Sequence, residues 1–212
     1  FFPPLTLKKI LKKYKKKITN INFIVGDFAE NYRKNNFKKC LIMDNGTRSL
    51  SSLINKTVPY LKKINNIEFY VCIDHLSQKF KDQIYMSNNI VPVSGLKNMH
   101  EKLSEADIII ARGGFNTISE CLVLKKPALF FNEKNNPEVS ENLRLLTKKY
   151  KLACLINKGD WGKNFQKKLN SFIKKDSKRI YKKLKYKKFR FNGAKQVVEM
   201  ISKKLTRERL ND

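Results

Sequence analysis

The chain lacks several features that mark other protein classes. No apolar run approaches the roughly 20 residues that a membrane-spanning helix needs. The first residues, Phe1-Phe2-Pro3-Pro4, carry neither an initiator methionine nor a signal-peptide pattern. We therefore expect a soluble globular chain whose natural start lies upstream. At 212 residues and 41% hydrophobic content, the chain is long enough to bury one core.

Cysteine and histidine are few and widely spaced, without the close pairing that zinc sites and redox motifs show. The four cysteines lie in apolar segments and are Cys40, Cys72, Cys121 and Cys154. We expect them to be buried free thiols in a reducing compartment, so no metal and no cofactor is predicted. His75 and His100 have no nucleophile or carboxylate at a useful spacing, which favours surface or loop positions over catalysis.

Acidic residues are scarce, at 18 against 46 Lys and Arg, and the formal net charge is +28. Such a balance favours anionic partners, namely nucleotides, acidic membrane surfaces or nucleic acid. The excess is lysine, since only eight arginines occur. Lysine runs such as that at 182–188 are typical of solvated helix faces, or of a basic surface that rests on anionic lipid. A nucleic-acid-binding module is an alternative, which the absence of an aromatic-and-arginine motif for RNA disfavours.

Short apolar runs alternate with amphipathic stretches, a rhythm that predicts an α/β fold with a doubly wound parallel sheet. Strands are expected at 22–25, 39–43, 68–73, 90–93, 107–111, 128–131 and 153–156. Helices are expected at 5–17, 50–64, 77–85, 99–105, 117–124, 139–150, 164–174 and 193–204. In such sheets ligands bind at the carboxyl ends of the strands, so the loops there are the places to search.

The most informative stretch is 106–120, which reads ADIIIARGGFNTISE. It predicts a strand, a turn at Arg112-Gly113-Gly114 and a helix that begins near Asn116. Paired glycines let a backbone approach a ligand closely, and the first N–H groups of a helix suit a phosphate. Glu120, about one turn inside the helix, could accept hydrogen bonds from ribose hydroxyls. The same pattern also fits an ordinary tight turn with Asn116 or Thr117 as the N-cap.

The order of these motifs resembles the C-terminal, nucleotide-sugar-binding domain of family 28-type glycosyltransferases, one half of the GT-B fold. That family includes the N-acetylglucosamine transferase of peptidoglycan synthesis and related UDP-sugar hydrolases. The likeness runs over about 23–204. Its strongest part joins 106–120, with a Thr-x-x-Glu helix start, to Lys126-Pro127-Ala128-Leu129-Phe130.

The resemblance implies a Rossmann-like domain that binds the donor through particular positions. The diphosphate is expected on the corner Arg112, Gly113, Gly114, Phe115, Asn116 and Thr117. Glu120 would take the ribose, Gly95 and Leu96 the base, and Glu138 and Asn142 the sugar. The family's first glycine-rich loop corresponds to Met43-Asp44-Asn45-Gly46-Thr47, which keeps only Gly46. We expect Gly46, Thr47 and Arg48 to contribute, and Asp44 would repel a phosphate unless Arg48 or a bound cation neutralises it.

These features predict the donor-binding portion of a glycosyltransferase that moves a hexosyl group from a nucleotide-diphosphate sugar, UDP-linked, to a glycan or lipid-linked acceptor in cell-envelope synthesis. The alternative within the same fold is a nucleotide-sugar hydrolase. We expect 1–37 to be the tail and linker of a missing N-terminal domain, 38–205 the donor domain and 206–212 a C-terminal tail. The missing half could also be a partner subunit. The expected location is cytoplasmic, at the inner face of the membrane.

Overall fold

The computed structural model describes residues 37–44, 48–133, 135–188 and 193–209. The expected strand at 22–25, the basic helix at 5–17, and Gly46 and Thr47 lie outside the described residues.

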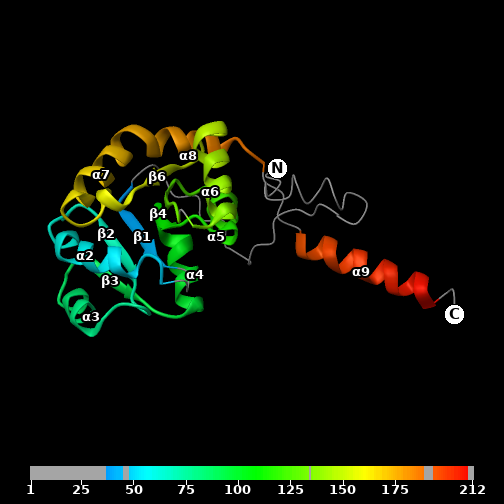
Figure 1. Cartoon of the computed structure of the whole chain (residues 1–212), viewed down its shortest axis with the longest axis horizontal. Helices are drawn as coiled ribbons and strands as arrows, with labels where there is room; N and C mark the ends of the chain where they lie inside the picture. Colours follow the sequence, from blue (N-terminus) through cyan, green and yellow to red (C-terminus); the bar gives the residue numbers. More distant parts are fainter. Residues whose placement is uncertain (1–36, 45–47, 134, 189–192, 210–212) are drawn as a thin grey trace.

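A single sheet of six parallel strands forms the centre of the molecule (Figure 1). The strands are β1 (Lys39–Met43), β2 (Glu68–Cys72), β3 (Ile90–Val93), β4 (Ile108–Arg112), β5 (Ala128–Phe131) and β6 (Cys154–Ile156). Their order in the sheet is β3-β2-β1-β4-β5-β6. This doubly wound topology confirms the predicted fold class. The strands are nearly continuous apolar runs because helices cover both faces of a parallel sheet.

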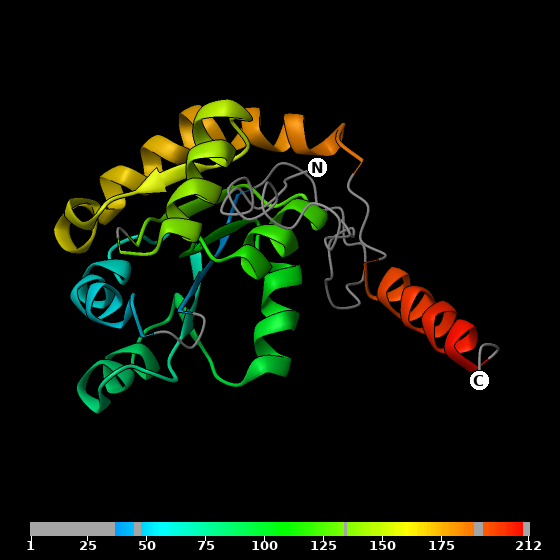
Figure 2. The ribbon, with the colours of Figure 1, turned by 45° about the vertical axis from the view of Figure 1, so that its right-hand side comes forward.

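Helices on both faces connect the strands (Figures 1 and 2). The connecting helices are α2 (Ser51–Leu61), α3 (Gln78–Tyr85), α4 (Leu96–Glu105), α5 (Phe115–Val123) and α6 (Pro137–Arg144). The last strand is followed by α7 (Phe165–Phe172), α8 (Lys178–Lys185) and α9 (Gly193–Arg209). A π-helical turn, η2 (Leu145–Lys149), extends α6, and another, η5 (Ile173–Ser177), joins α7 to α8. Figure 1 shows α2, α3 and α7 on one side of the sheet and α4, α5 and α6 on the other.

The helix after β6 is longer than the sequence pattern predicts. We expected it to end at 174, but α7, η5 and α8 continue the helical path to Lys185. Ile180 and Leu184 are fully buried and lie four residues apart, which keeps α8 on the core. Lysines surround these two positions, so the apolar spacing is hard to see in the sequence.

The core contains three of the four cysteines, Cys40, Cys72 and Cys121, and all four are free thiols, as expected. Burial raises the pKa of the Cys40 and Cys121 thiols far above the ordinary value. Cys154 is half-buried. The described residues contain no group of three His, Cys, Asp or Glu side chains placed to hold a metal ion. Among them, no helix has the length and apolar character needed to cross a bilayer.

Candidate site at the carboxyl ends of β1 and β4

The strand order reverses between β1 and β4. The chain leaves β1 toward β2 and β3, then returns to place β4 on the other side of β1, with Met43 beside Ala111. Connections on the two sides of such a point diverge and leave a crevice at the carboxyl ends of the strands. The segments beginning at Asp44 and at Arg112 follow these two strand ends. The edge of the sheet where these two strands end, at which such a topology leaves a crevice, is therefore the candidate site.

The corner between β4 and α5 brings the positive end of a helix to this crevice. Gly114 precedes α5 in an extended conformation, with φ −70° and ψ 152°. Its carbonyl accepts the Ile118 N–H at 3.0 Å, which fixes Phe115, Asn116 and Thr117 as the first turn. The dipole of the helix makes this turn favourable for a negative group.

Gly113 has a different role from the one we expected. Its N–H donates to the carbonyl of Phe131 in β5 at 3.2 Å, so this amide is engaged by the sheet. A Cβ atom at Gly113 would lie 2.5 Å from Leu143 Cδ2. The structure thus corrects the expectation that the Gly113 backbone presents its amide to a diphosphate. Gly113 lacks a side chain because α6 packs there.

Arg112, at the end of β4, lies beside Gly114: a Cβ atom there would be 3.6 Å from the Arg112 Nη1. The Arg112 Nε also donates to Glu133 Oε2 at 2.6 Å, and both side chains are largely covered. Arg112 therefore adds a positive charge to the corner, although the Glu133 carboxylate offsets part of it. This pair could not be predicted from the sequence pattern, because the two residues come from the ends of different strands.

Glu120, on α5, is the carboxylate expected to accept hydrogen bonds from a ribose. Its side chain is 16% exposed and makes no hydrogen bond to a described residue. Among the described residues, its ionic contact is with His100 of α4, whose Nε2 lies 4.0 Å from Glu120 Oε1. Burial raises the pKa of Glu120, and His100 lowers it in part. His100 lies at the surface, as expected, and its carboxylate neighbour comes from the next helix, so the sequence spacing around His100 does not indicate this contact.

The Asp44 carboxylate accepts hydrogen bonds at the start of α2. The side chain is only 4% exposed, and its Oδ2 accepts the Leu50 N–H at 2.9 Å and the Ser51 hydroxyl at 3.0 Å. A carboxylate is stabilised at the N-terminus of a helix by these donors and by the dipole. We expected Arg48 to neutralise Asp44. The structure instead shows α2 as a partner of Asp44, with Arg48 exposed and at a positive φ of 57°.

The segment that follows β3 is hydrogen-bonded to the segment that follows β2. Gly95 turns the chain with a positive φ of 75°, and α4 begins at the next residue, Leu96. Asp74, which follows β2, accepts the Gly95 N–H at 3.3 Å and the hydroxyl of Ser94. Leu96 is therefore the first helical residue and not a loop residue. Gly95 stays exposed, and nothing lies within 4 Å of the position its Cβ would occupy.

The start of α6 carries the two residues expected to contact the sugar. Asn136 caps this helix by accepting the Val139 N–H at 3.1 Å. Glu138 is exposed in the first turn, whereas Asn142, one turn later, is 8% exposed. The Asn142 Nδ2 is buried without a hydrogen-bond partner among the described residues. The next residue, Leu143, is the one that packs on Gly113, so α6 is attached to the β4–α5 corner.

Comparisons with known proteins agree with this fold. The solved structure of MurG from Acinetobacter baumannii matches with a TM-score of 0.61 and 18% identity, over 82% of this chain and 51% of that one. Phytolacca americana UGT2, complexed with UDP-2fluoro-glucose and pterostilbene, matches with a TM-score of 0.60 and 17% identity, over 79% and 42%.

A UDP-GlcNAc 2-epimerase from Neisseria meningitidis, bound to UDP-GlcNAc, matches with a TM-score of 0.51 and 19% identity, over 93% and 48%. The chain thus spans about half the length of these structures. At such identities the likeness shows the fold, which is one half of the GT-B architecture. The sequence matches no curated protein.

A sequence family gives the more specific result. The glycosyltransferase family 28 C-terminal domain matches residues 45–198, which is most of the chain and includes β4, α5 and α6. The chain therefore belongs to the glycosyltransferase family 28 C-terminal domain, the nucleotide-sugar-binding part of these enzymes.

Proposed function

We propose that the crevice between β1 and β4 binds the nucleotide-diphosphate sugar, UDP-linked, from which a glycosyltransferase moves a hexosyl group. The β4–α5 corner would hold the diphosphate through Gly114, Asn116 and the Arg112 guanidinium. As the leaving diphosphate gains charge, the helix dipole and Arg112 would stabilise it electrostatically. Gly95 and Leu96 would lie against the base, and Asn142 would reach the sugar.

The observation that carries this proposal is the burial of the Glu120 carboxylate without a hydrogen bond to the described residues. A largely buried carboxylate normally has hydrogen-bond donors around it. Glu120 has His100 at 4.0 Å and no hydrogen bond to the described residues. The two hydroxyls of a ribose would supply two O–H donors to its two oxygens. Binding would thus repay the cost of burying this charge, which the raised pKa of Glu120 reflects.

The test compares UDP with 2′-deoxy-UDP by calorimetric titration. A hydrogen bond to a charged group contributes about 1.5–3 kcal/mol, so the chain should bind UDP roughly tenfold or more tightly than the deoxy analogue. Glu120→Ala should bind UDP more weakly and should no longer distinguish the two ligands. Glu101→Ala is the matched control, because Glu101 is an exposed carboxylate on α4.

Two results would count against the proposal. One is the absence of binding to any of UDP, GDP, CDP and UDP-GlcNAc. The other is a preference for UDP over its deoxy analogue that survives in Glu120→Ala. Binding of GDP or CDP in place of UDP would keep the site and change the base.

The acceptor belongs to the same proposal. We infer that a second half of the GT-B fold, on the same or another chain, presents a glycan or lipid-linked acceptor of the cell envelope at the cytoplasmic face of the membrane. Glu138 is exposed at the start of α6, where it could contact such a sugar or acceptor hydroxyl. Product analysis with full-length protein distinguishes transfer from hydrolysis, since a hydrolase releases free sugar when no acceptor is added.

A further inference from the structure

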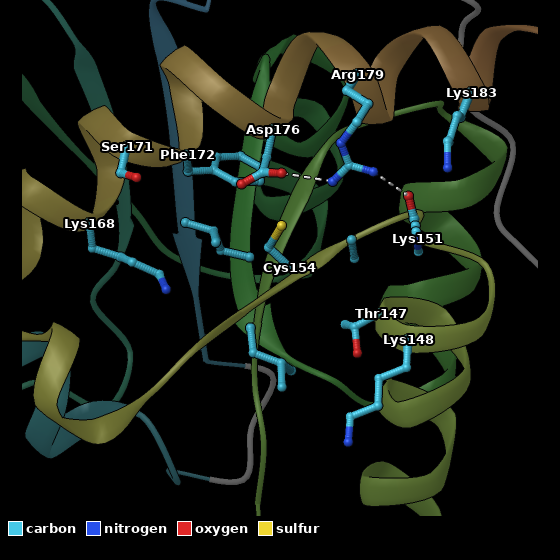
Figure 3. Close-up of a pocket in the computed structure, with 13 residues that line it drawn as sticks. Thr147, Lys148, Lys151, Cys154, Lys168, Ser171, Phe172, Asp176, Arg179 and Lys183 are labelled. Carbon is cyan, nitrogen blue, oxygen red and sulfur yellow. Dashed lines mark hydrogen bonds and ion pairs between the residues drawn. The ribbon is translucent and has the colours of Figure 1, made fainter.

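A second pocket lies over the edge of the sheet, away from the crevice at the carboxyl ends of β1 and β4. It has a volume of about 920 Å³ and is bounded by β6, by the π-helical turn η2 and by the helical path from α7 to α8 (Figure 3). Leu129 and Cys154, neighbours near the amino ends of β5 and β6, contribute to its floor. Its position separates it from the proposed donor site.

Positive charge dominates the lining of this pocket. Five cationic side chains face one carboxylate, that of Asp176, and the five are Lys148, Lys151, Lys168, Arg179 and Lys183. Lys168 pairs with Asp160 at 3.4 Å, outside the pocket lining. Lys148, Lys151 and Lys183 have no ion-pair partner among the described residues. Like charges that share one cavity repel one another, and a bound anion would relieve that repulsion.

Arg179 is held in place within the pocket. Its Nη2 lies 2.7 Å from Asp176 Oδ1, and its Nη1 donates to the Lys151 carbonyl at 3.4 Å. Both contacts are drawn in Figure 3, where Lys183 comes from the same helix as Arg179. A guanidinium fixed by two partners keeps further N–H groups for a ligand and loses little entropy on binding. This geometry suits the oxygens of a phosphate.

The rest of the lining is apolar or carries a hydroxyl. Leu129, Ala153, Leu155 and Phe172 supply the apolar surface, and Thr147 and Ser171 supply hydroxyls. A phosphate ion alone would leave much of a cavity of about 920 Å³ empty. We propose that this pocket binds an organic phosphate, with the phosphate on Arg179 and the surrounding lysines and an apolar group on the floor. A soluble metabolite and a lipid headgroup share this chemistry.

Cys154 gives a local readout because it lines the pocket, whereas the other three thiols are buried in the core. The neutral reagent N-ethylmaleimide would label Cys154, and peptide mass spectrometry would follow the rate at constant ionic strength. One arm titrates phenyl phosphate. The other adds phosphatidylcholine vesicles with or without phosphatidylglycerol. We expect ligand to slow the labelling of Cys154 several-fold.

Paired charge reversals test which residues bind the ligand. Lys148→Glu/Lys183→Glu should weaken the protecting ligand roughly tenfold or more, because two charge-assisted contacts are lost. Lys175→Glu/Lys182→Glu is the control: both residues are exposed on the same helical path, neither lines the pocket, and the change in net charge is equal. The control should bind within about twofold of the unaltered chain, since solvent-exposed charges that do not contact the ligand are largely screened.

Each outcome decides the proposal. Protection by phenyl phosphate assigns a soluble ligand, and protection only by phosphatidylglycerol vesicles assigns a lipid headgroup; both support the pocket. Protection by neither probe overturns it. Equal weakening in the two charge-reversed pairs also overturns it, because the attraction would then come from the overall charge of the chain. Glu120→Ala should leave the protection of Cys154 unchanged, which separates this pocket from the donor site.

Discussion

Gly113 has no side chain because Leu143 already occupies the space where one would lie. The paired glycines in the sequence look alike, yet they have different roles. A Cβ atom would collide with Leu143 at Gly113, whereas at Gly114 it would meet only the Arg112 guanidinium at an ordinary distance of 3.6 Å. At the residue scale, one glycine thus serves packing and the other precedes α5 beside the Arg112 side chain.

We expect Gly113→Ala to lower the free energy of unfolding by about 1–3 kcal/mol, the usual cost of overpacking a core. Chemical denaturation would measure it. Gly159→Ala is the control, because nothing lies within 4 Å of its Cβ position. Adding Leu143→Ala to Gly113→Ala should cost less than the two single changes together, since the added methyl group would enter the space that Leu143 vacates. Simple additivity would contradict the proposed contact.

Glu120→Gln should make the chain more stable at neutral pH while weakening nucleotide binding. Burial raises the pKa of Glu120 in the folded chain, so the folded state holds this proton more tightly than the unfolded state. The charge therefore lowers stability as pH rises from the ordinary glutamate value of about 4.3 through the raised one. The stability gain of Glu120→Gln should be absent near pH 4 and grow toward pH 7. Denaturation at several pH values measures this difference, and a gain that is constant with pH would contradict it.

At the scale of elements, Asp44 shows how the loop after β1 departs from the glycine-rich pattern. Its carboxylate accepts hydrogen bonds from the Leu50 N–H and the Ser51 hydroxyl, so the chain's own side chain occupies the start of α2. The crevice therefore relies on the start of α5 for its favourable helix dipole.

Asp44→Ala should lower the free energy of unfolding by about 1–3 kcal/mol, because buried donors at the start of α2 lose their acceptor. Thermal and chemical denaturation would measure this loss. Asp44→Asn, which keeps one oxygen acceptor, should cost less. If Asp44 acted mainly by repelling the diphosphate, Asp44→Asn would instead bind UDP markedly more tightly.

The elements themselves were largely predictable. β1, β3 and β5 have the bounds expected from their short apolar runs, and the turn into α5 lies where the glycines indicated. The continuation into α8 was not predicted, because only Ile180 and Leu184 mark its buried side. Contacts between elements could not be predicted from the sequence either. His100 and Glu120, for example, lie on different helices, α4 and α5, and meet only in the folded chain.

At the scale of the whole molecule, charge is the dominant property. The net charge of +28 makes the folded chain repel itself. Sodium chloride between about 20 and 300 mM should therefore raise the thermal midpoint by several degrees, since roughly 1 kcal/mol corresponds to about 2–4 °C at this size. Calorimetry at increasing salt would show it. A falling midpoint would mean that attractive pairs such as Lys39–Glu68 and Lys102–Glu105 outweigh the repulsion.

The family and the parallel sheet followed from the order of motifs, and both are confirmed by the sequence match and the strand order. The roles of Gly114, Asn116, Glu120 and Asn142 toward a donor remain predictions. The pocket beside β6 could not be foreseen, because its cations come from η2, α7 and α8 and meet only in the folded chain.

The contact of Leu143 with Gly113 also constrains how this scaffold could be re-engineered. The helix that would read the sugar and the turn that would hold the phosphates touch through one side chain and one missing side chain. Grafting α6 from a relative to alter donor choice would succeed only if the graft and position 113 were exchanged as a matched pair. A change of sugar preference in this domain would thus require matched changes in at least two segments.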